Sequence, residues 1–511
     1  MRRSLFLLTG LLLLLPVAVA PATAGPLASD PLVQASSTSP LAAGCGLGPA
    51  GPDAVFGEGQ IDFDTEVEPW VDVNPTDPDN IVAFWQQDRW SNGGARSNVA
   101  GVSFDGGDSW TNVVVPGLSD CSGGSFERAS DPWVSFGPDG TLHQVSLLID
   151  IETPPNRTGG FGPSALAVSK SVDGGLNWTD PILVAENANP RFLHDKESIT
   201  ADPTDPDFVY VVWDQLKLGV GDVINPERVP GNLAFKGAAM FTRSTDGGDT
   251  WEAPRVLYDP GAIAQTIGNQ LVVLPDGTLV TFFDEILGVR GDAGFLPFNL
   301  SLKFSRDNGQ TWLPRGRPIR TNKILPLSTV TPDEEIGIRD GAVLFDVAVD
   351  PANGNLYAVW QDARFSGFEL DEIAFSMSTD GGFNWTNPIK VNATPPNAEN
   401  PLRQQAFLPS VEVAGGTVGV SYYDFRNDTD TGELADHFLI HCHGSCGNPA
   451  NWGDEVRVTD TSFDYEQAPI ARELFLGDYV GLASDGTDFL SFFPQSSAAD
   501  AASGFFRRVG P

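Results

Sequence analysis

The chain contains 511 residues, of which 67 are Asp or Glu and 30 are Lys or Arg, so its formal net charge is −37. This charge would repel a polyanionic nucleic acid or an anionic membrane surface, and neither is expected as a partner. The composition favours a soluble exported surface over a calcium-specific one. No cofactor is therefore expected, and a structural calcium ion has no further support.

The N-terminus predicts export. Arg2 and Arg3 precede an apolar run from Leu5 to Ala20, and the small residues Ala22-Thr23-Ala24 follow it. This order is typical of a cleavable secretory signal over residues 1–24, so the protein is expected to be secreted, either outside the cell or into a periplasm. Residues 25–53 are rich in Ala, Ser, Pro and Gly and predict a flexible linker. A single folded domain is expected over residues 54–511.

One eight-residue motif, Ser-x-Asp-x-Gly-x-x-Trp, occurs five times. Its copies are Ser103–Trp110, Ser171–Trp178, Ser244–Trp251, Ser305–Trp312 and Ser378–Trp385. Glycine supplies the positive φ of a tight turn, the aspartate can accept hydrogen bonds from turn N–H groups, and the tryptophan can pack beneath the turn. Each copy therefore predicts a β-hairpin. Successive serines lie 61 to 73 residues apart, which suits one blade of a β-propeller per repeat.

A second pattern recurs between these motifs: two apolar strands joined by an Asp, Pro or Gly turn and ending in aromatic and acidic residues. Its copies are 69–88, 131–147, 197–214, 269–285, 345–362, 408–424 and 477–493. They predict the two inner strands of seven blades. The last blade ends at the C-terminus, so its outermost strand is expected from Val55 to Phe63, which would close the ring.

The Ser-x-Asp-x-Gly-x-x-Trp motif resembles the Asp-box, or bacterial neuraminidase repeat, of the sialidase superfamily. The resemblance implies an all-β fold consisting of a single β-propeller with Asp-box hairpins. Seven blades are favoured by the strand count, and the six blades usual in sialidases are the alternative.

Four cysteines in an exported chain predict two disulfides. Cys442 and Cys446 can close a small loop, which leaves Cys45 and Cys121 as the second pair. The loop falls where the sixth Asp-box turn would be, and Trp452 follows it. We therefore expect a degenerate box in which a disulfide replaces the Asp-Gly-Gly turn.

Catalytic and substrate-binding residues are expected where first strands begin and second strands end. These positions converge on the propeller channel at the face opposite the boxes. Arginines there can bind a substrate carboxylate, while carboxylates and tyrosines can move protons or attack the substrate. Ion pairs between blades are the structural alternative. The candidate catalytic residues are Tyr423, Tyr479, Glu197, Glu285, Asp424 and Asp478. The candidate substrate-binding residues are Arg339, Arg364, Arg403, Arg426 and Arg128.

The sialidase resemblance implies three arginines that bind the carboxylate of sialic acid, a tyrosine nucleophile activated by a glutamate, and an aspartate that supplies the proton. The first arginine normally stands in an Arg-Ile-Pro entry to the first blade. This chain has Glu66-Val67-Glu68-Pro69-Trp70 there, so that arginine is absent.

The sequence therefore predicts a secreted, sialidase-like glycoside hydrolase acting on terminal, acidic sugars of a glycan or glycoprotein. The alternatives are a non-catalytic glycan- or protein-binding propeller and a polysaccharide lyase. Oligomeric state is not readable from the sequence.

Overall fold

The computed structural model describes residues 26–46, 52–53, 57–151, 161–189, 191–217, 236–262, 264–287, 298–429, 432–442 and 444–510. The predicted signal at 1–24 lies outside these residues. Within them the chain is all-β, with five short 3₁₀ turns and no α-helix. No helix of the described residues is long and apolar enough to cross a membrane.

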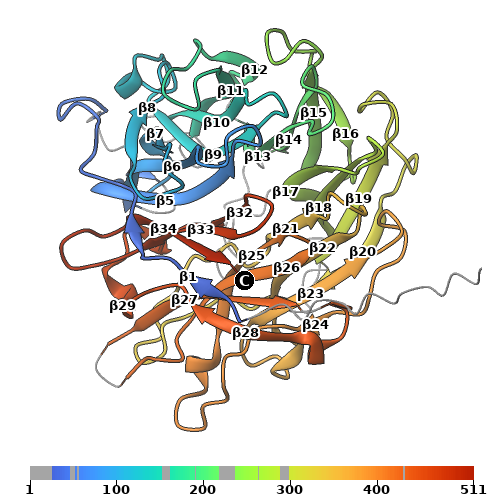
Figure 1. Cartoon of the computed structure of the whole chain (residues 1–511). Helices are drawn as coiled ribbons and strands as arrows, with labels where there is room; N and C mark the ends of the chain where they lie inside the picture. Colours follow the sequence, from blue (N-terminus) through green and yellow to red (C-terminus); the bar gives the residue numbers. More distant parts are fainter. Residues whose placement is uncertain are drawn as a thin grey trace, which may run out of the picture.

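The strands form antiparallel sheets arranged consistently with a β-propeller and fall, in chain order, into units 1 to 7 (Figure 1). A single bridge between Ala95 and Ala129 joins units 1 and 2 into one sheet. Unit 1 contains β5 (Ile61–Val73), β6 (Ile81–Trp90), β7 (Ala95–Ser103) and β8 (Thr111–Val114). Unit 2 contains β9 (Arg128–Phe136), β10 (Leu142–Ile151), β11 (Phe161–Ser171) and β12 (Ile182–Asn187). Unit 3 contains β13 (Phe192–Ala201), β14 (Val209–Lys217), β15 (Lys236–Ser244) and β16 (Arg255–Tyr258). Unit 4 contains β17 (Ala264–Val273), β18 (Leu279–Leu287), β19 (Phe298–Ser305) and β20 (Ile319–Ile324).

The remaining units follow the same order. Unit 5 contains β21 (Phe345–Val349), β22 (Leu356–Asp362), β23 (Glu372–Ser378) and β24 (Ile389–Lys390). Unit 6 contains β25 (Ala406–Ala414), β26 (Thr417–Asp424), β27 (Leu434–Cys442) and β28 (Trp452–Arg457). Unit 7 contains β32 (Gly481–Ser484), β33 (Phe489–Gln495) and β34 (Ser503–Gly510), and β1 (Ala28–Ser29) and β2 (Val33–Gln34) pair with β34.

Short elements connect or extend these units. The strands among them are β3 (Pro52–Asp53), β4 (Gly57–Glu58), β29 (Phe463–Asp464), β30 (Ile470–Ala471) and β31 (Glu473–Leu474). The 3₁₀ turns are η1 (Asp120–Ser122), η2 (Ala363–Phe365), η3 (Pro401–Gln404), η4 (Pro449–Asn451) and η5 (Tyr465–Gln467).

Successive units contact one another through their first strands. Each first strand contacts the first strand of the next unit, in the order β5, β9, β13, β17, β21, β25 and β32, and β32 contacts β5 again. Seven apolar clusters lie between successive units, including one between units 7 and 1 in which Phe492 and Phe506 pack with Ile81 and Trp85. Both faces of each sheet are therefore covered by a neighbour, and burial of these faces holds the units together.

An N-terminal segment pairs with the last strand of unit 7, as predicted, but the residues predicted to form that segment are wrong. The outermost strands of unit 7 come from β1 and β2, inside the segment expected to be a flexible linker. Ile61 to Phe63 instead begin β5, whose register continues against Arg89 and Trp90 of β6. Val55 and Phe56 lie outside the described residues.

Each of the five motifs forms a hydrogen-bonded turn between the third and fourth strands of its unit. In the fifth copy the Ser378 hydroxyl accepts the N–H of Gly382 at 3.0 Å and donates to Asp380 at 2.9 Å. Asp380 accepts the N–H of Asn384 at 2.9 Å, and Trp385 Nε1 donates to the Gly382 carbonyl at 3.0 Å. The aspartate therefore satisfies turn donors and the tryptophan packs beneath the turn, as the sequence predicts.

The sixth unit confirms the degenerate box. Both predicted disulfides are present, Cys45–Cys121 and Cys442–Cys446. Cys442 ends β27 where a box serine ends the third strand of units 1 to 5, and its sulfur accepts the N–H of Gly444 at 3.3 Å. Trp452 Nε1 donates to the Cys446 carbonyl at 2.9 Å, as Trp110, Trp178 and Trp385 do to glycine carbonyls in their boxes. Sulfur therefore replaces the serine and aspartate of this turn.

The register places all boxes at one end of the channel. In units 1 to 5 the first residue of the second strand pairs with the box serine, and in unit 6 Val418, the second residue of β26, pairs with Cys442. The first turn and the box turn therefore share an end. First strands begin at the opposite end, where the candidate site is expected.

Replacing Ser378 by Ala should lower the free energy of unfolding by about 1–3 kcal/mol, because the buried N–H of Gly382 loses its acceptor. Urea unfolding measures the change. Ser109→Ala is the matched control, since its hydroxyl donates at an exposed position of the first box. Equal stability of the two variants would contradict the structural role given to the box serine.

Candidate active site

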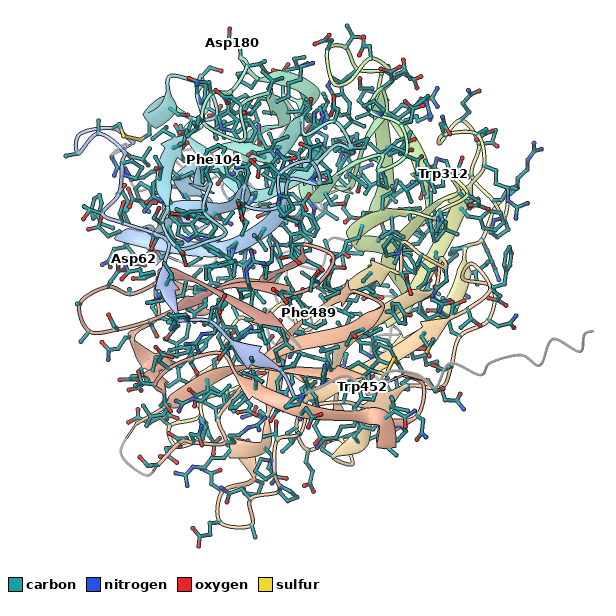
Figure 2. All side chains as sticks on the ribbon, viewed as in Figure 1. Asp62, Phe104, Asp180, Trp312, Trp452 and Phe489 are labelled. Atoms are coloured by element: carbon teal, nitrogen blue, oxygen red, sulfur yellow. A yellow bond between two sulfur atoms is a disulfide. The ribbon has the colours of Figure 1, made fainter. Side chains whose placement is uncertain are left out.

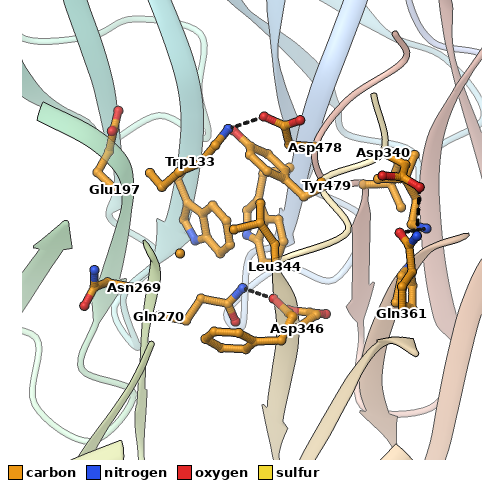
Figure 3. A pocket seen from close by; sticks show the side chains of 18 residues that line it. Trp133, Glu197, Asn269, Gln270, Asp340, Leu344, Asp346, Gln361, Asp478 and Tyr479 are labelled. Atoms are coloured by element: carbon orange, nitrogen blue, oxygen red, sulfur yellow. Dashed lines mark hydrogen bonds and ion pairs between the residues drawn. The ribbon is translucent and has the colours of Figure 1, made fainter. Parts of the chain in front are cut away.

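The box-free end of the channel contains two adjoining cavities. The central cavity has a volume of about 490 Å³ and is lined by strand ends and by two loops, including Arg89, Asp195, Arg339 and Arg472. The inner cavity, of about 40 Å³, is lined by Trp70, Trp133, Glu197 and Tyr479 among others. Lys196, Leu344 and Asp478 line both. Figure 3 shows the inner cavity with Trp133 and Tyr479 facing one another.

A bulge in the first strands aims charged side chains into this region. Glu68, Asp131 and Lys196 take positive φ angles of 50°, 45° and 48°, and the strand register shifts at each of them. Side chains with a Cβ rarely adopt this conformation, and strain of this kind is concentrated at functional sites. Three equivalent positions in units 1 to 3 therefore share one strained geometry and point to one place.

The ammonium of Lys196 joins the carboxylates at this point. Its Nζ lies 3.0 Å from Glu68 Oε1, 3.4 Å from Asp131 Oδ2 and 2.7 Å from Asp478 Oδ2. Arg339 Nε donates to Asp478 Oδ1 at 2.9 Å, and its second nitrogen bonds the other carboxylate oxygen. The side chains of Glu68, Asp131 and Asp478 are at most 7% exposed, so the network is largely shielded from water.

Burial and charge give these carboxyl groups different pKa values. Burial raises the pKa of Glu68 to about 7, against the opposing charge of Lys196. Burial and the neighbouring Asp131 raise the pKa of Asp195 to about 7. Burial also acts on Asp478, but Arg339 and Lys196 outweigh it and hold its pKa well below the usual range. One site thus contains both carboxyl groups that hold a proton near neutrality and a carboxylate that stays ionised.

Three guanidinium groups line the central cavity. The Cζ atoms of Arg89 and Arg339 lie 4.9 and 4.5 Å from the centroid of the same Phe475 ring. Burial, and then the charge of Arg339, lower the pKa of Arg472 to about 9 and of Arg89 to about 10. Arg89 Nε is buried without a hydrogen-bond partner among the described residues. Like charges held this closely favour binding of an anion such as a carboxylate.

Tyr479 lies in the inner cavity. Its ring packs edge-on to Trp70 and tilted against Trp133, its hydroxyl donates to the Pro132 carbonyl at 3.2 Å, and Lys196 Nζ lies 5.4 Å from its ring centroid. Burial and nearby carboxylates, Glu68 first, raise its pKa well above the usual value. The phenol is therefore protonated unless a carboxylate takes its proton.

Glu197 also lines the inner cavity. Both of its carboxyl oxygens are buried without a hydrogen-bond partner among the described residues, and burial raises its pKa well above the usual value. Of the predicted residues, the structure thus brings together Tyr479, Glu197, Asp478 and Arg339.

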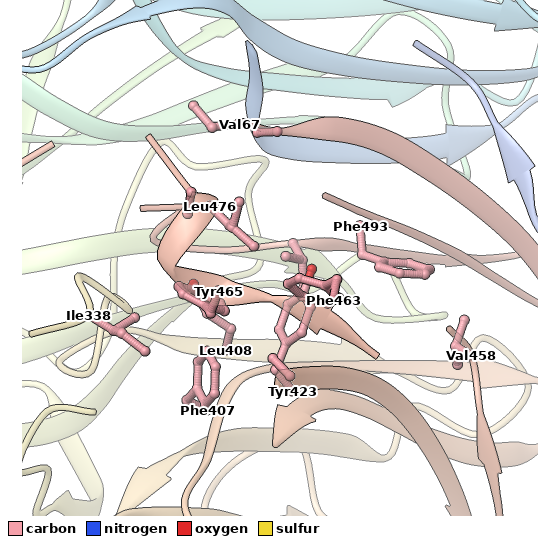
Figure 4. Packing of buried hydrophobic residues seen from close by; sticks show 14 of the residues in the cluster. Val67, Ile338, Phe407, Leu408, Tyr423, Val458, Phe463, Tyr465, Leu476 and Phe493 are labelled. Atoms are coloured by element: carbon pink, nitrogen blue, oxygen red, sulfur yellow. The ribbon is translucent and has the colours of Figure 1, made fainter. Parts of the chain in front are cut away.

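Tyr423 does not belong to this group, and the prediction that it lies at the channel mouth is wrong. Its side chain is fully buried in the apolar cluster between units 6 and 7, stacked on Phe407 (Figure 4). Its hydroxyl donates to the Pro494 carbonyl at 2.7 Å. Side chains of a strand stand perpendicular to the sheet, so Tyr423 points to the neighbouring unit and not to the channel.

Four of the five predicted substrate-binding arginines line neither the central nor the inner cavity. Each is hydrogen-bonded to an aspartate or stacked on a tryptophan. Arg426 Nε donates to Asp424 at 2.6 Å, and Arg364 Nε donates to Asp362 at 2.7 Å. Arg403 Nε donates to Asp428 at 2.8 Å. Arg128 stacks over Trp90 with Cζ 4.1 Å from a ring centroid. The predicted convergence of Arg403 and Arg426 with Arg339 is therefore wrong, and Asp424 is part of the same outlying pair.

Glu285 lies in a different cavity. Its carboxylate accepts a hydrogen bond from the Tyr258 hydroxyl and another from Arg320 Nε at 2.5 Å. Neither partner lines the central or inner cavity.

Sequence reasoning did not select Arg472, Trp70 or Trp133 as site residues, and of the carboxylates that pair with Lys196 it named only Asp478 as a catalytic candidate. Arg472 lies between β30 and β31, a small hairpin outside the repeats. The matching Glu68-Pro69-Trp70 and Asp131-Pro132-Trp133 triplets were a usable signal. The two tryptophans stack with centroids 3.4 Å apart, which shows that equal positions in neighbouring units meet.

No family model matches the chain, and no curated protein matches it. Among solved structures, a protein of unknown function from Dyadobacter fermentans is 13% identical over 88% of this chain and 97% of that one, with a TM-score of 0.46. The α-L-arabinanase of Penicillium chrysogenum is 12% identical over 77% and 94%, with a TM-score of 0.43.

A sialidase from Trypanosoma rangeli is 12% identical over 87% of this chain and 55% of its own, with a TM-score of 0.42. Sialidases are therefore among the structures that this chain resembles, as the Asp-box motif predicts. At these identities and scores the likeness carries no argument about what this chain does.

The raised pKa values predict how stability depends on pH. Between the unfolded values near 4 and the folded value of about 7, Asp195 binds more protons in the folded state. Its contribution to stability is therefore present at low pH and is lost as pH rises through about 7. Urea midpoints should be higher at pH 5 than at pH 8, and Asp195→Asn should reduce that difference. Asp108→Asn, at an exposed position, is the control and should leave the difference unchanged.

Proposed function

We propose that this protein is a secreted glycoside hydrolase whose central cavity binds a terminal acidic sugar of a glycan. The observation that carries the proposal is the combination in one cavity of three clustered arginines with carboxyl groups of contrasting pKa. An acidic sugar needs cations to hold its carboxylate, and cleavage of its glycosidic bond needs a proton donor.

The closed order of first strands and the seven apolar clusters support a seven-bladed propeller. In this arrangement the cavities occupy the channel end opposite the boxes. Signal-like residues at the N-terminus and two disulfides support an exported protein. The partner would then be a glycan or glycoprotein met outside the cytoplasm.

Arg89 and Arg472 would bind the sugar carboxylate beside Arg339. Arg339 is oriented by Asp478, which stays ionised and fixes the guanidinium plane. The unpaired Nε of Arg89 offers a donor that a ligand oxygen would satisfy. Bidentate guanidinium contacts would fix the orientation of the sugar as well as its charge.

Asp195 has the pKa expected of a group that donates a proton near neutral pH, and it would protonate the leaving oxygen as the glycosidic bond breaks. Tyr479 would attack the anomeric carbon, its phenolic proton passing to the neighbouring Glu68 carboxylate. Water would then release the sugar from the tyrosine: Asp195 would take a proton from the attacking water, and the Glu68 carboxyl group would return the phenolic proton to Tyr479.

Tyr479→Phe tests this assignment. Turnover of a glycan with a terminal acidic sugar should fall at least about a hundredfold, because only the nucleophilic hydroxyl is lost. Binding of the glycan should change little, and the free energy of unfolding should fall by no more than about 1–3 kcal/mol, the cost of the lost bond to the Pro132 carbonyl. Reducing-end release measures turnover, and calorimetry measures binding.

Tyr423→Phe is the matched control. Its hydroxyl bonds a buried carbonyl, so its loss should reduce stability by about 1–3 kcal/mol and leave turnover unchanged. Binding of acidic glycans without any product would instead establish a non-catalytic binding propeller. Products that absorb as unsaturated sugars would establish a lyase, and either result would contradict the proposal.

A further inference from the structure

A third cavity, of about 750 Å³, lies on the outer side of units 3 and 4, between β16 and the strands β18 to β20. We call it the outer cavity. It shares no lining residue with the central or inner cavity. Trp312, one of its lining residues, lies at the outer edge of the molecule in Figure 2.

The outer cavity is basic in a strongly acidic protein. Five of its lining residues carry positive charge: Arg255, Lys303, Arg315, Arg317 and Arg320. The chain as a whole has a net charge of −37. A concentration of cations on such a background is not explained by average composition.

Lys303 is the buried member of this group, with 3% of its surface exposed. Its ammonium donates to the carbonyls of Pro314 at 2.6 Å and Gly316 at 3.0 Å. These carbonyls accept two of its three hydrogen atoms without cancelling its charge. The same two bonds tie the 314–317 loop to β19, so the loop is held in place beside the cavity.

Arg315 and Arg317 flank Gly316 in this loop and are exposed. Gly316 has a φ of 84°, a conformation that glycine adopts readily. Among the described residues, no carboxylate forms an ion pair with either arginine. Both guanidinium groups are therefore available to a ligand.

The two acidic residues that line the outer cavity, Asp259 and Glu285, already bond to neighbouring side chains. The Glu285 carboxylate accepts from Arg320 and from Tyr258, and Asp259 pairs with Lys236 at 2.8 Å. Outside the lining, Glu252 pairs with Arg255 at 2.7 Å. These pairs leave Lys303, Arg315 and Arg317 as an excess of positive charge around one cavity.

Aromatic rings accompany the cations. Tyr258 and Trp312 line the cavity, and the Tyr258 ring centroid lies 5.4 Å from Lys303 Nζ. Apolar ring faces can pack on the C–H face of a sugar, while guanidinium groups pair with its carboxylates. A volume of about 750 Å³ is in the range of ligand-binding pockets.

We propose that the outer cavity is a separate binding site for an acidic saccharide, a short sugar chain that bears carboxylates. The site would hold part of a polyanionic glycan away from the central cavity. This inference does not depend on catalysis at the central cavity.

Calorimetric titration of the full chain with trigalacturonate at low salt tests the proposal. Arg315→Ala/Arg317→Ala should weaken binding at this site at least about tenfold, since each variant position removes one charged contact. Both arginines are exposed, so the variant should fold. Arg306→Ala removes the charge of an exposed arginine of the same unit that does not line the cavity, and it should bind as the unaltered protein does.

Further probes separate the contributions of charge and sugar. The methyl ester of trigalacturonate should not bind, and citrate, which has carboxylates without a sugar ring, should bind more weakly than trigalacturonate. Unchanged affinity of the double variant, or equal affinity for the ester or citrate, would overturn the proposal. Tighter binding of an oligothymidylate through the same arginines would show a nucleic-acid site and would also overturn it.

A variant of the central cavity separates this proposal from the proposed function. Arg472→Ala should abolish hydrolysis of acidic glycans and keep binding at the outer cavity. The Arg315→Ala/Arg317→Ala protein should keep hydrolysis of a small acidic glycoside. If no glycan is hydrolysed but the double variant still loses trigalacturonate binding, the proposed function fails and the outer site stands.

Discussion

The centre of the protein depends on the ammonium of Lys196. The bulges of three successive units direct Glu68, Asp131 and Lys196 to one point, and Asp478 joins them from the start of unit 7. Without the ammonium, Arg339 alone would offset three nearly buried carboxylates, a much larger cost than the strain of the bulges. The network therefore fixes how the first and last units meet and, through Asp478, how Arg339 is presented to the central cavity.

Most of the fold was predictable because its determinants are local. An Asp-box specifies its own turn through bonds among eight consecutive residues, and two apolar runs around a short turn specify a hairpin. The sulfur-bridged turn at Cys442 was predictable for the same reason, since its place in the repeat could be counted. The strand that closes unit 7 was not. The edge of β34 accepts any short extended segment, and neither β1 nor β2 has a pattern that marks it as that strand.

The site was predictable only in part because position along a strand does not settle which way a side chain points. Tyr423 and Tyr479 both neighbour an aspartate at a predicted strand end. Tyr423 lies within β26, where alternation directs it into the neighbouring unit, whereas Tyr479 precedes β32 and is free of that alternation. Arg472 comes from a hairpin outside the repeats, so a search confined to strand ends could not find it. The arginines that were found at strand ends mostly pair with adjacent aspartates.

The alternating direction of side chains along each strand also explains where ligand-binding sites can lie in this molecule. Each sheet is covered on both faces by its neighbours, and among the described residues cavities lined by basic groups lie at the channel end and along the outer edge of units 3 and 4. The central cavity lies at the channel end, and the outer cavity lies at the outer edge of units 3 and 4. At the channel end the cations are balanced by buried carboxylates, which suits a site that must also move protons. At the outer edge Lys303, Arg315 and Arg317 have no such balance, and an anionic ligand is the simplest source of the missing charge.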